Sequence, residues 1–182
     1  MGIKPIPASM SADRAFSLFE PSRWRAPLVV SAPHAGVQAP AGFRLPKGPA
    51  GDLIAGLSDT RIDRLARPAA QALGFPLLAS VYLRAFVDLN RGEDELDPLL
   101  IDGLPLAQRG VVPGSRVASG LGVIPRLADA HTPIYKDKLS LAAVRSRLRR
   151  YYRPYHDALS GLIKTCLAHF GCLLYTSPSP RD

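Results

Sequence analysis

The chain has 182 residues, of which 47% are hydrophobic, and a formal net charge of +8. This length and composition suit one globular domain with a real core. No apolar run approaches the roughly 18 residues of a membrane span, and no signal-peptide core follows the N-terminus, so we expect a soluble cytoplasmic protein. Cys166 and Cys172 belong to no paired metal-binding motif, which argues against a disulfide framework.

The positive charge is compatible with nucleic-acid binding, because clustered Lys and Arg neutralise phosphates. The densest cluster lies between Lys136 and Arg153, where apolar residues recur at helical spacing. We interpret it as an amphipathic helix with a solvated basic face, since no aromatic-rich RNA motif or zinc finger accompanies it. A basic nucleic-acid-binding module stays as the alternative to an enzyme.

Strand-like and helix-like segments alternate along the chain, which predicts an α/β fold in which helices flank a sheet. The N-terminal half predicts a strand at 26–32 with Pro27 at its entry, a Pro- and Gly-rich loop at 37–51, and a helix at 58–73. Ser58 or Asp59 is a plausible N-cap of this helix and Gly74 its C-terminal stop. Further along, the sequence predicts strands at 75–79 and 81–89, an irregular excursion at 93–125, and one or two helices over 139–170 that break near Pro154.

His34 follows the first predicted strand and precedes Gly36. Its imidazole is therefore expected at the carboxyl end of a strand, where open α/β sheets usually bind ligands. Asp59 and Asp63 stand four residues apart at the start of the next helix, and a carboxylate there could complete a His/carboxylate zinc site. Placement alone equally suits a hydrogen-bonded loop histidine and ordinary first-turn acidic residues.

The predicted strand at 81–89 and the Asn90 that follows it carry an unusual set of polar residues. Period-2 alternation places Arg84, Asp88 and Asn90 on one face. A buried sheet is normally apolar on both sides, so these residues either reach a cleft or form a buried ion pair between Arg84 and Asp88. In a cleft, Arg84 and Arg91 could bind a carboxylate, with Asn90 as an amide donor.

These blocks, taken in order, resemble the N-formylglutamate amidohydrolase family, whose fold is similar to that of zinc carboxypeptidases and aspartoacylases. The resemblance rests on five segments: Ser31-Ala32-Pro33-His34-Ala35-Gly36, Asp59 with Asp63-Arg64-Leu65, Arg84 with Val87-Asp88-Leu89-Asn90-Arg91, Gly122-Val123-Ile124-Pro125-Arg126, and Tyr152-Arg153-Pro154-Tyr155-His156. It implies a mixed sheet flanked by helices and a cytoplasmic zinc hydrolase of amino-acid catabolism. Leu83 departs from the family, in which a Ser commonly precedes the Arg.

The resemblance also implies roles for individual residues. His34 and an acidic residue, most simply Asp59 with Asp63 as the other choice, would bind zinc. Arg84, Asn90 and Arg91 would bind substrate carboxylates. The expected reaction is metal-dependent hydrolysis of an N-formyl or other N-acyl amino acid, such as N-formylglutamate, to formate and the amino acid. We assign no residue as the general base.

The last ten residues, 173–182, look like translated sequencing-adaptor DNA. We therefore expect residues 1–172 to form a partial amidohydrolase-like domain, incomplete at its C-terminus, and 173–182 to be a non-native tail. The family continues with a further apolar strand and an Asp-x-His-Ser-Met block that carries another histidine ligand. A catalytic zinc normally has three protein ligands, so we expect the chain to be an inactive fragment as it stands.

Overall fold

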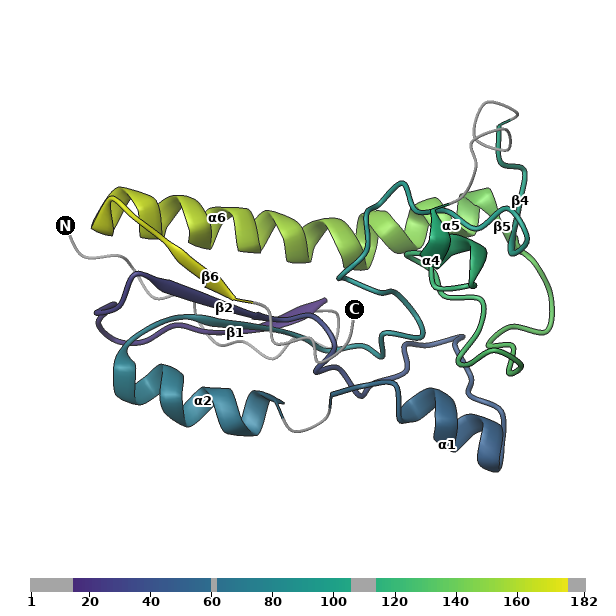
Figure 1. The fold of residues 1–182 in the computed structure, drawn as a ribbon, viewed down its shortest axis with the longest axis horizontal. Coiled ribbons are helices and arrows are strands. Elements are labelled where there is room, and N and C mark those ends of the chain that lie inside the picture. The colour runs from purple at the N-terminus through teal and green to yellow at the C-terminus, as the bar shows by residue number, and fades with distance from the viewer. Residues whose placement is uncertain (1–14, 60–61, 106–113, 177–182) are drawn as a thin grey trace.

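The computed structural model describes residues 15–59, 62–105 and 114–176. At its centre lies a four-stranded sheet in the order β1-β3-β2-β6 (Figure 1). Its strands are β1 Phe16–Phe19, β2 Leu28–Ala32, β3 Leu77–Ser80 and β6 Leu174–Thr176. β1 is antiparallel to β3, whereas β2 runs parallel to both β3 and β6. The sheet is thus mixed, and the predicted mixed α/β class is confirmed.

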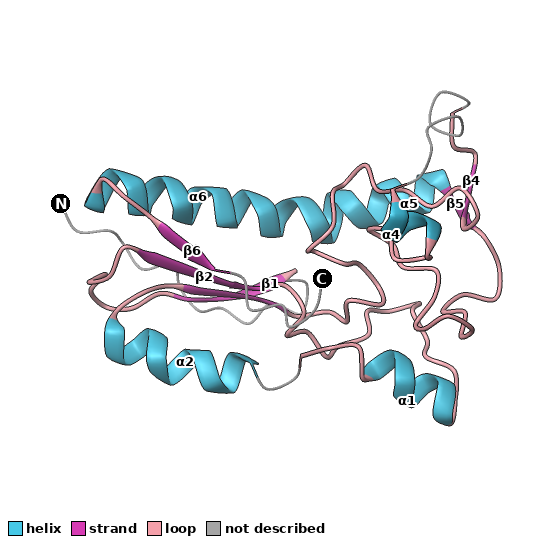
Figure 2. Cartoon of the chain, in the orientation of Figure 1, coloured by secondary structure: helices cyan, strands magenta, loops and turns pink. Residues whose placement is uncertain are grey.

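Helices cover both faces of this sheet. α2 (Ile62–Leu73) lies on one face and α6 (Arg153–Phe170) on the other (Figure 2). The inner strands β2 and β3 are almost fully buried as a result, and their alternate residues enter different clusters. Val29 and Leu78 belong to the cluster that includes residues of α6, whereas Val30 packs with Ala70 of α2.

The remaining elements lie beyond the end of the sheet, where the loops gather (Figure 1). They are α1 Pro49–Ala55, β4 Ile101–Asp102, α4 Ser115–Ala118, β5 Leu139–Ser140, α5 Leu141–Arg147 and the π-helical turn η1 Leu148–Tyr152. β4 and β5 form a separate parallel pair. α5, η1 and α6 follow one another without a gap, so residues 141–170 form one long helical rod with a π-helical turn inside it.

The prediction of a strand at 81–89 is wrong. This segment is a series of turns, and Tyr82 alone within it forms a bridge, to Gln38. The amides of Phe86 and Val87 bond back to the Leu83 carbonyl, so the chain bends here. These amides are therefore not available for hydrogen bonds to a neighbouring strand. Alternation of side chains between two faces of a strand therefore does not apply to Arg84, Asp88 and Asn90.

Other boundaries differ more modestly. α1 begins inside the segment predicted as a loop at 37–51, and α2 begins at Ile62 rather than at 58. Gly74 does end α2, with a φ of 73° and its amide bonded to the Ala70 carbonyl. The break predicted near Pro154 is absent. Pro154 is the second residue of α6, just after the π-helical turn η1, and the helix continues through it.

Two strands of the sheet were not predicted at all. β1 is one edge of the sheet, and β6 lies within residues 173–182, the segment expected to be a non-native tail. β6 pairs with β2 from Leu28 to Val30. The strand assignment does not bear on the origin of this segment. No helix within the described residues is long and apolar enough to cross a membrane.

Candidate metal and substrate site

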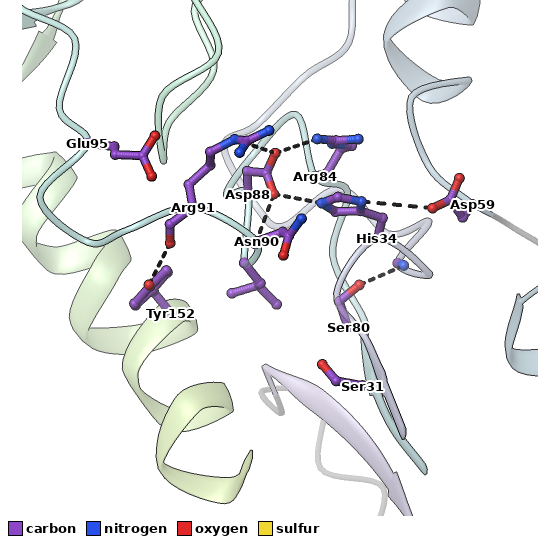
Figure 3. A network of polar contacts seen from close by, with 12 residues as sticks. Ser31, His34, Asp59, Ser80, Arg84, Asp88, Asn90, Arg91, Glu95 and Tyr152 are labelled. Carbon is purple, nitrogen blue, oxygen red and sulfur yellow. Dashed lines mark hydrogen bonds and ion pairs between the residues drawn. The ribbon is translucent and has the colours of Figure 1, made fainter. Parts of the chain in front are cut away.

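The candidate site lies where the loops leave β2 and β3. His34 stands in the turn that follows β2, and Asp88 stands in the irregular segment that follows β3 (Figure 3). Because β2 and β3 are parallel neighbours, their carboxyl ends lie at the same edge of the sheet. This is the edge at which α/β folds usually bind ligands.

His34 and Asp88 form a buried pair. Nε2 of His34 lies 2.7 Å from Oδ1 of Asp88, and each residue is 2% exposed. An ionised carboxylate only accepts hydrogen bonds, so Nε2 is the nitrogen that carries the hydrogen. When the ring is neutral, Nδ1 carries the lone pair, and this is the form in which histidine binds metals.

Asp59 faces that second nitrogen. Its Oδ2 lies 3.8 Å from Nδ1 of His34, and its backbone amide donates to the His34 carbonyl at 2.8 Å. Oδ2 is buried and has no hydrogen-bond partner within the described residues. A buried carboxylate oxygen normally has a partner, so this atom has unused capacity for a ligand.

The pair fits two ligand positions of a zinc site. Two ligands about 2.0–2.1 Å from a tetrahedral metal stand roughly 3.3 Å apart, somewhat less than the distance between these two atoms. The carboxylate of Asp88 on the far nitrogen of His34 is the usual partner of a zinc-binding imidazole. Across the part of the chain that the structure describes, no three His, Cys, Asp or Glu side chains gather as a metal cluster, so a third ligand is not among them.

Two arginines lie close to the carboxylate of Asp88. Nη2 of Arg84 lies 2.6 Å from Oδ2 of Asp88, and Nε of Arg91 lies 3.9 Å from that oxygen. The amide of Asn90 donates to Oδ1 of Asp88 at 3.0 Å. The ion pair between Arg84 and Asp88, which the sequence left open, is therefore formed. Asp88 also connects His34, predicted to bind metal, with Arg84, predicted to bind substrate.

Asp88 is strongly biased towards its ionised form. Burial by itself raises the pKa of this carboxyl group, but the hydrogen bond from His34 and the positive charge of Arg84 outweigh it and lower the pKa to about 2. The arginines balance the buried charge of Asp88. Both arginines thus lie within 3.9 Å of one carboxylate oxygen of Asp88, Oδ2.

The loop that carries His34 is fixed by a close approach between two chain segments. The Gly36 amide donates to the Ser80 hydroxyl at 2.8 Å, and both groups are buried. A Cβ atom at Gly36 would lie 2.1 Å from the carbonyl oxygen of Tyr82. Only glycine therefore allows the turn after β2 to lie directly against the chain that leaves β3.

The other predicted residues are placed as follows. Asp63, the alternative acidic ligand, lies in α2, but its side chain is outside the described part of the structure. His131 and His169 are exposed, whereas His156 lies in α6 and bonds to the Leu89 carbonyl.

Sequence reasoning did not identify Asp88 as the partner of His34. A signal was present, because Asp88 is a charged residue between Val87 and Leu89 in an otherwise apolar run. A charge in such a run is normally paired. The sequence suggested Arg84 as that partner and gave no indication of a residue 54 positions away.

A surface hollow of about 480 Å³ lies elsewhere, at the end of β1 beside α2. Phe19, Glu20, Pro21, Ser22, Arg23, Arg25, Arg67 and Gln71 line it. It includes none of the residues discussed above, and we do not assign the candidate site to it.

Two comparisons with known proteins show what this chain is similar to. The sequence matches the family model described as N-formylglutamate amidohydrolase over residues 26–177. The fold is similar to the crystal structure of N-formylglutamate amidohydrolase from Ralstonia eutropha JMP134, with a TM-score of 0.78 and 34% sequence identity. That match covers 92% of this chain and 63% of the solved one, so this chain spans less than two thirds of that protein's length. A comparison with curated proteins gave no match.

Proposed function

Because this chain belongs to the N-formylglutamate amidohydrolase family, we propose that it takes part in hydrolysis of the formyl amide bond of N-formylglutamate, with formate and glutamate as products. The observation that carries the proposal is the linked group of His34, Asp59, Asp88 and Arg84 at the carboxyl ends of two parallel strands. Neither comparison favours the basic nucleic-acid-binding alternative.

His34 and Asp59 would bind a divalent metal, with zinc the first choice. The proposal is supported by the lone-pair nitrogen and the unpartnered carboxylate oxygen that face each other at 3.8 Å. A bound zinc ion would lower the pKa of a water molecule and polarise the formyl carbonyl. Asp88 would hold the His34 ring with Nδ1 directed towards Asp59. We assign the general base to none of the described residues.

Arg84 and Arg91 would attract the substrate. N-formylglutamate carries two carboxylates, and a guanidinium group can bind a carboxylate through two hydrogen bonds. Arg84 is the more accessible of the two arginines, since 22% of its side chain is exposed against 8% for Arg91. We therefore propose that Arg84 contacts a substrate carboxylate directly, while Arg91 and Asn90 complete the site.

The experiment is an assay of formate release from N-formylglutamate by the zinc-loaded chain, with and without chelator, together with measurement of bound zinc. His34→Asn should abolish zinc binding and formate release. His169→Asn changes an exposed histidine on α6 and should alter neither. Zinc binding without formate release would retain the metal site. Calorimetric binding of N-formylglutamate would then distinguish the inactive fragment expected from the sequence, which binds it, from a site for another substrate, which does not. Failure of the chain to bind zinc would reject the roles of His34 and Asp59.

A further inference from the structure

The segment that carries Arg84, Asp88, Asn90 and Arg91, which we name the arginine loop (residues 84–91), is held by side chains of the long helical rod. Three side-chain donors reach three of its backbone carbonyls. Nη1 of Arg147 donates to the Phe86 carbonyl at 2.9 Å, Nε2 of His156 to the Leu89 carbonyl at 3.1 Å, and the Tyr152 hydroxyl to the Arg91 carbonyl at 2.6 Å.

These bonds meet a need that the fold creates. The arginine loop is a series of turns, so its carbonyls lack the ladder partners that a strand would supply. Buried carbonyls without partners are costly, and the loop is largely buried. The helical rod supplies the missing donors along the length of the loop, from Phe86 to Arg91.

The π-helical turn explains why one helical rod can supply all three hydrogen-bond donors. Arg147 and Tyr152 are five residues apart, and in a regular α-helix they would point about 140° away from each other. The turn η1, Leu148–Tyr152, lies between them and contains the wider i to i+5 hydrogen-bond pattern, which brings residues five apart towards the same side. His156 follows four residues after Tyr152, at ordinary α-helical spacing.

A second connection supports the first half of the loop. The guanidinium of Arg147 lies 4.1 Å from the centre of the Phe86 ring and donates to the Tyr135 hydroxyl at 2.6 Å. That hydroxyl in turn donates to the Ala85 carbonyl at 3.3 Å. The backbone next to Arg84 is thus held by both Arg147 and Tyr135.

The donors are in their proton-carrying forms near neutral pH. Burial, followed by the nearby carboxylates of Glu93 and Asp94, raises the pKa of Tyr152 to about 12. Burial also lowers the pKa of His156, which keeps the ring neutral with the hydrogen on Nε2 available to Leu89. These groups therefore act as constant hydrogen-bond donors and not as titrating switches.

We propose that Arg147, Tyr152 and His156 are positioning residues that set the affinity of the site for its carboxylate substrate, because they hold the arginine loop in the conformation that presents Arg84 and Arg91. The proposal rests on the proposed function, since it takes N-formylglutamate as the ligand. His34 bonds to Asp88 in the middle of the arginine loop and to Asp59, whereas Tyr152 holds the last carbonyl of the loop, that of Arg91. A change at Tyr152 should therefore affect substrate affinity more than zinc affinity.

Tyr152→Phe is the most specific test. It removes the hydroxyl that bonds to Arg91 and keeps the ring, which lies 4.2 Å from that of His156. We expect the metal-free chain to bind N-formylglutamate about five- to tenfold more weakly, as measured by calorimetry, because one partly buried hydrogen bond is lost. The affinity for zinc should change less than twofold. Hydrogen exchange should speed up in residues 84–91 and stay unchanged in β2 and β3.

Tyr151→Phe is the matched control, since it removes a hydroxyl from the adjacent residue of the same helical turn. It should leave the affinity for N-formylglutamate unchanged. If Tyr152→Phe binds N-formylglutamate as tightly as the unaltered chain, the positioning role is wrong. If zinc and substrate affinities fall together, Tyr152 supports only the general fold, and the proposal is again wrong. If the unaltered chain binds zinc but no N-formylglutamate, the proposed function fails first, and this inference fails with it.

Discussion

Nε2 of His34 and Oδ1 of Asp88 lie 2.7 Å apart, although 54 residues separate them in the sequence. The contact joins the turn after β2 to the arginine loop after β3 (Figure 3). It also leaves Nδ1 of His34 facing Asp59. One buried carboxylate thereby orients the candidate metal ligand and balances the charge of Arg84.

Asp88→Asn should weaken zinc binding without removing a metal ligand. The amide keeps the shape of the side chain but loses the charge that fixes the His34 ring and pairs with Arg84. We expect about a 10- to 100-fold loss of zinc affinity, as is typical for changes to the partner of a metal-binding histidine. Competition with a chromophoric chelator measures it.

Asp97→Asn is the control for that change. Asp97 is equally buried, and its Oδ2 lies 2.7 Å from Nε of Arg126. The control should destabilise the fold by roughly 1–3 kcal/mol, because Arg126 loses its charged partner in a partly buried pair, and should keep zinc affinity. Equal losses of zinc affinity in the two variants would show that Asp88 acts through stability alone.

Gly36→Ala should displace the turn that carries His34. The added Cβ would meet the Tyr82 carbonyl at 2.1 Å, and that carbonyl belongs to backbone, which cannot move aside as a flexible side chain could. We expect a loss of at least about 1–3 kcal/mol in the free energy of unfolding, as for other overpacked sites. Chemical denaturation measures the loss.

Gly161→Ala should change the free energy of unfolding in the opposite direction. Gly161 lies inside α6, and a Cβ there would contact no side chain and no other chain segment within 4 Å. Alanine should stabilise the helix by up to about 1 kcal/mol. A Gly36→Ala variant as stable as Gly161→Ala would contradict the close approach between the turn after β2 and Tyr82.

The two cysteines should react at very different rates. Cys166 is fully buried on α6, and burial raises the pKa of its thiol, whereas Cys172 is exposed. The thiolate is the reactive form, so both properties protect Cys166. A thiol reagent should label Cys172 in the folded chain and both cysteines in denaturant, as read by peptide mass spectrometry. Early labelling of Cys166 would contradict the packing of α6.

Asp129 should make a small pH-dependent contribution to stability. Its Oδ1 accepts the amides of His131 and Thr132, and these hydrogen bonds lower its pKa. A carboxyl group with a lowered pKa in the folded state stabilises the protein above its unfolded pKa of about 3.9, and this contribution disappears as the pH falls through the folded pKa.

Asp129→Asn tests this effect. The unaltered chain should unfold at a higher temperature than the variant at pH 6, and the two melting temperatures should converge as the pH falls below 4. Convergence on raising the pH instead would contradict the sign of the pKa shift.

Local patterns in the sequence were sufficient for much of the scaffold. The apolar run at 26–32 predicted β2, because a short buried strand is recognisable from its own residues. Gly74 predicted the end of α2, since a left-handed residue there is a local requirement. The long helix over 139–170 followed from helical spacing, although the π-helical turn η1 inside it carried no recognised signal.

The motifs also predicted the family and its candidate residues, since the order of the blocks around His34, Asp59 and Arg84 is specific. The sequence did not determine which of these residues contact one another. Val81–Asn90 has the composition of a strand, but a strand forms only where a partner offers its backbone, and here the chain turns back on Leu83 instead.

The sequence by itself thus determined the elements whose formation depends on neighbouring residues, together with the residue types that the chemistry requires. The tertiary structure alone decided that Asp88 reaches His34, that Arg84 is paired with Asp88, and that the helical rod holds the arginine loop through Tyr152. The physical reason is that such contacts join distant segments. Their formation depends on packing of the whole chain, in which β2 and β3 lie side by side beneath α6.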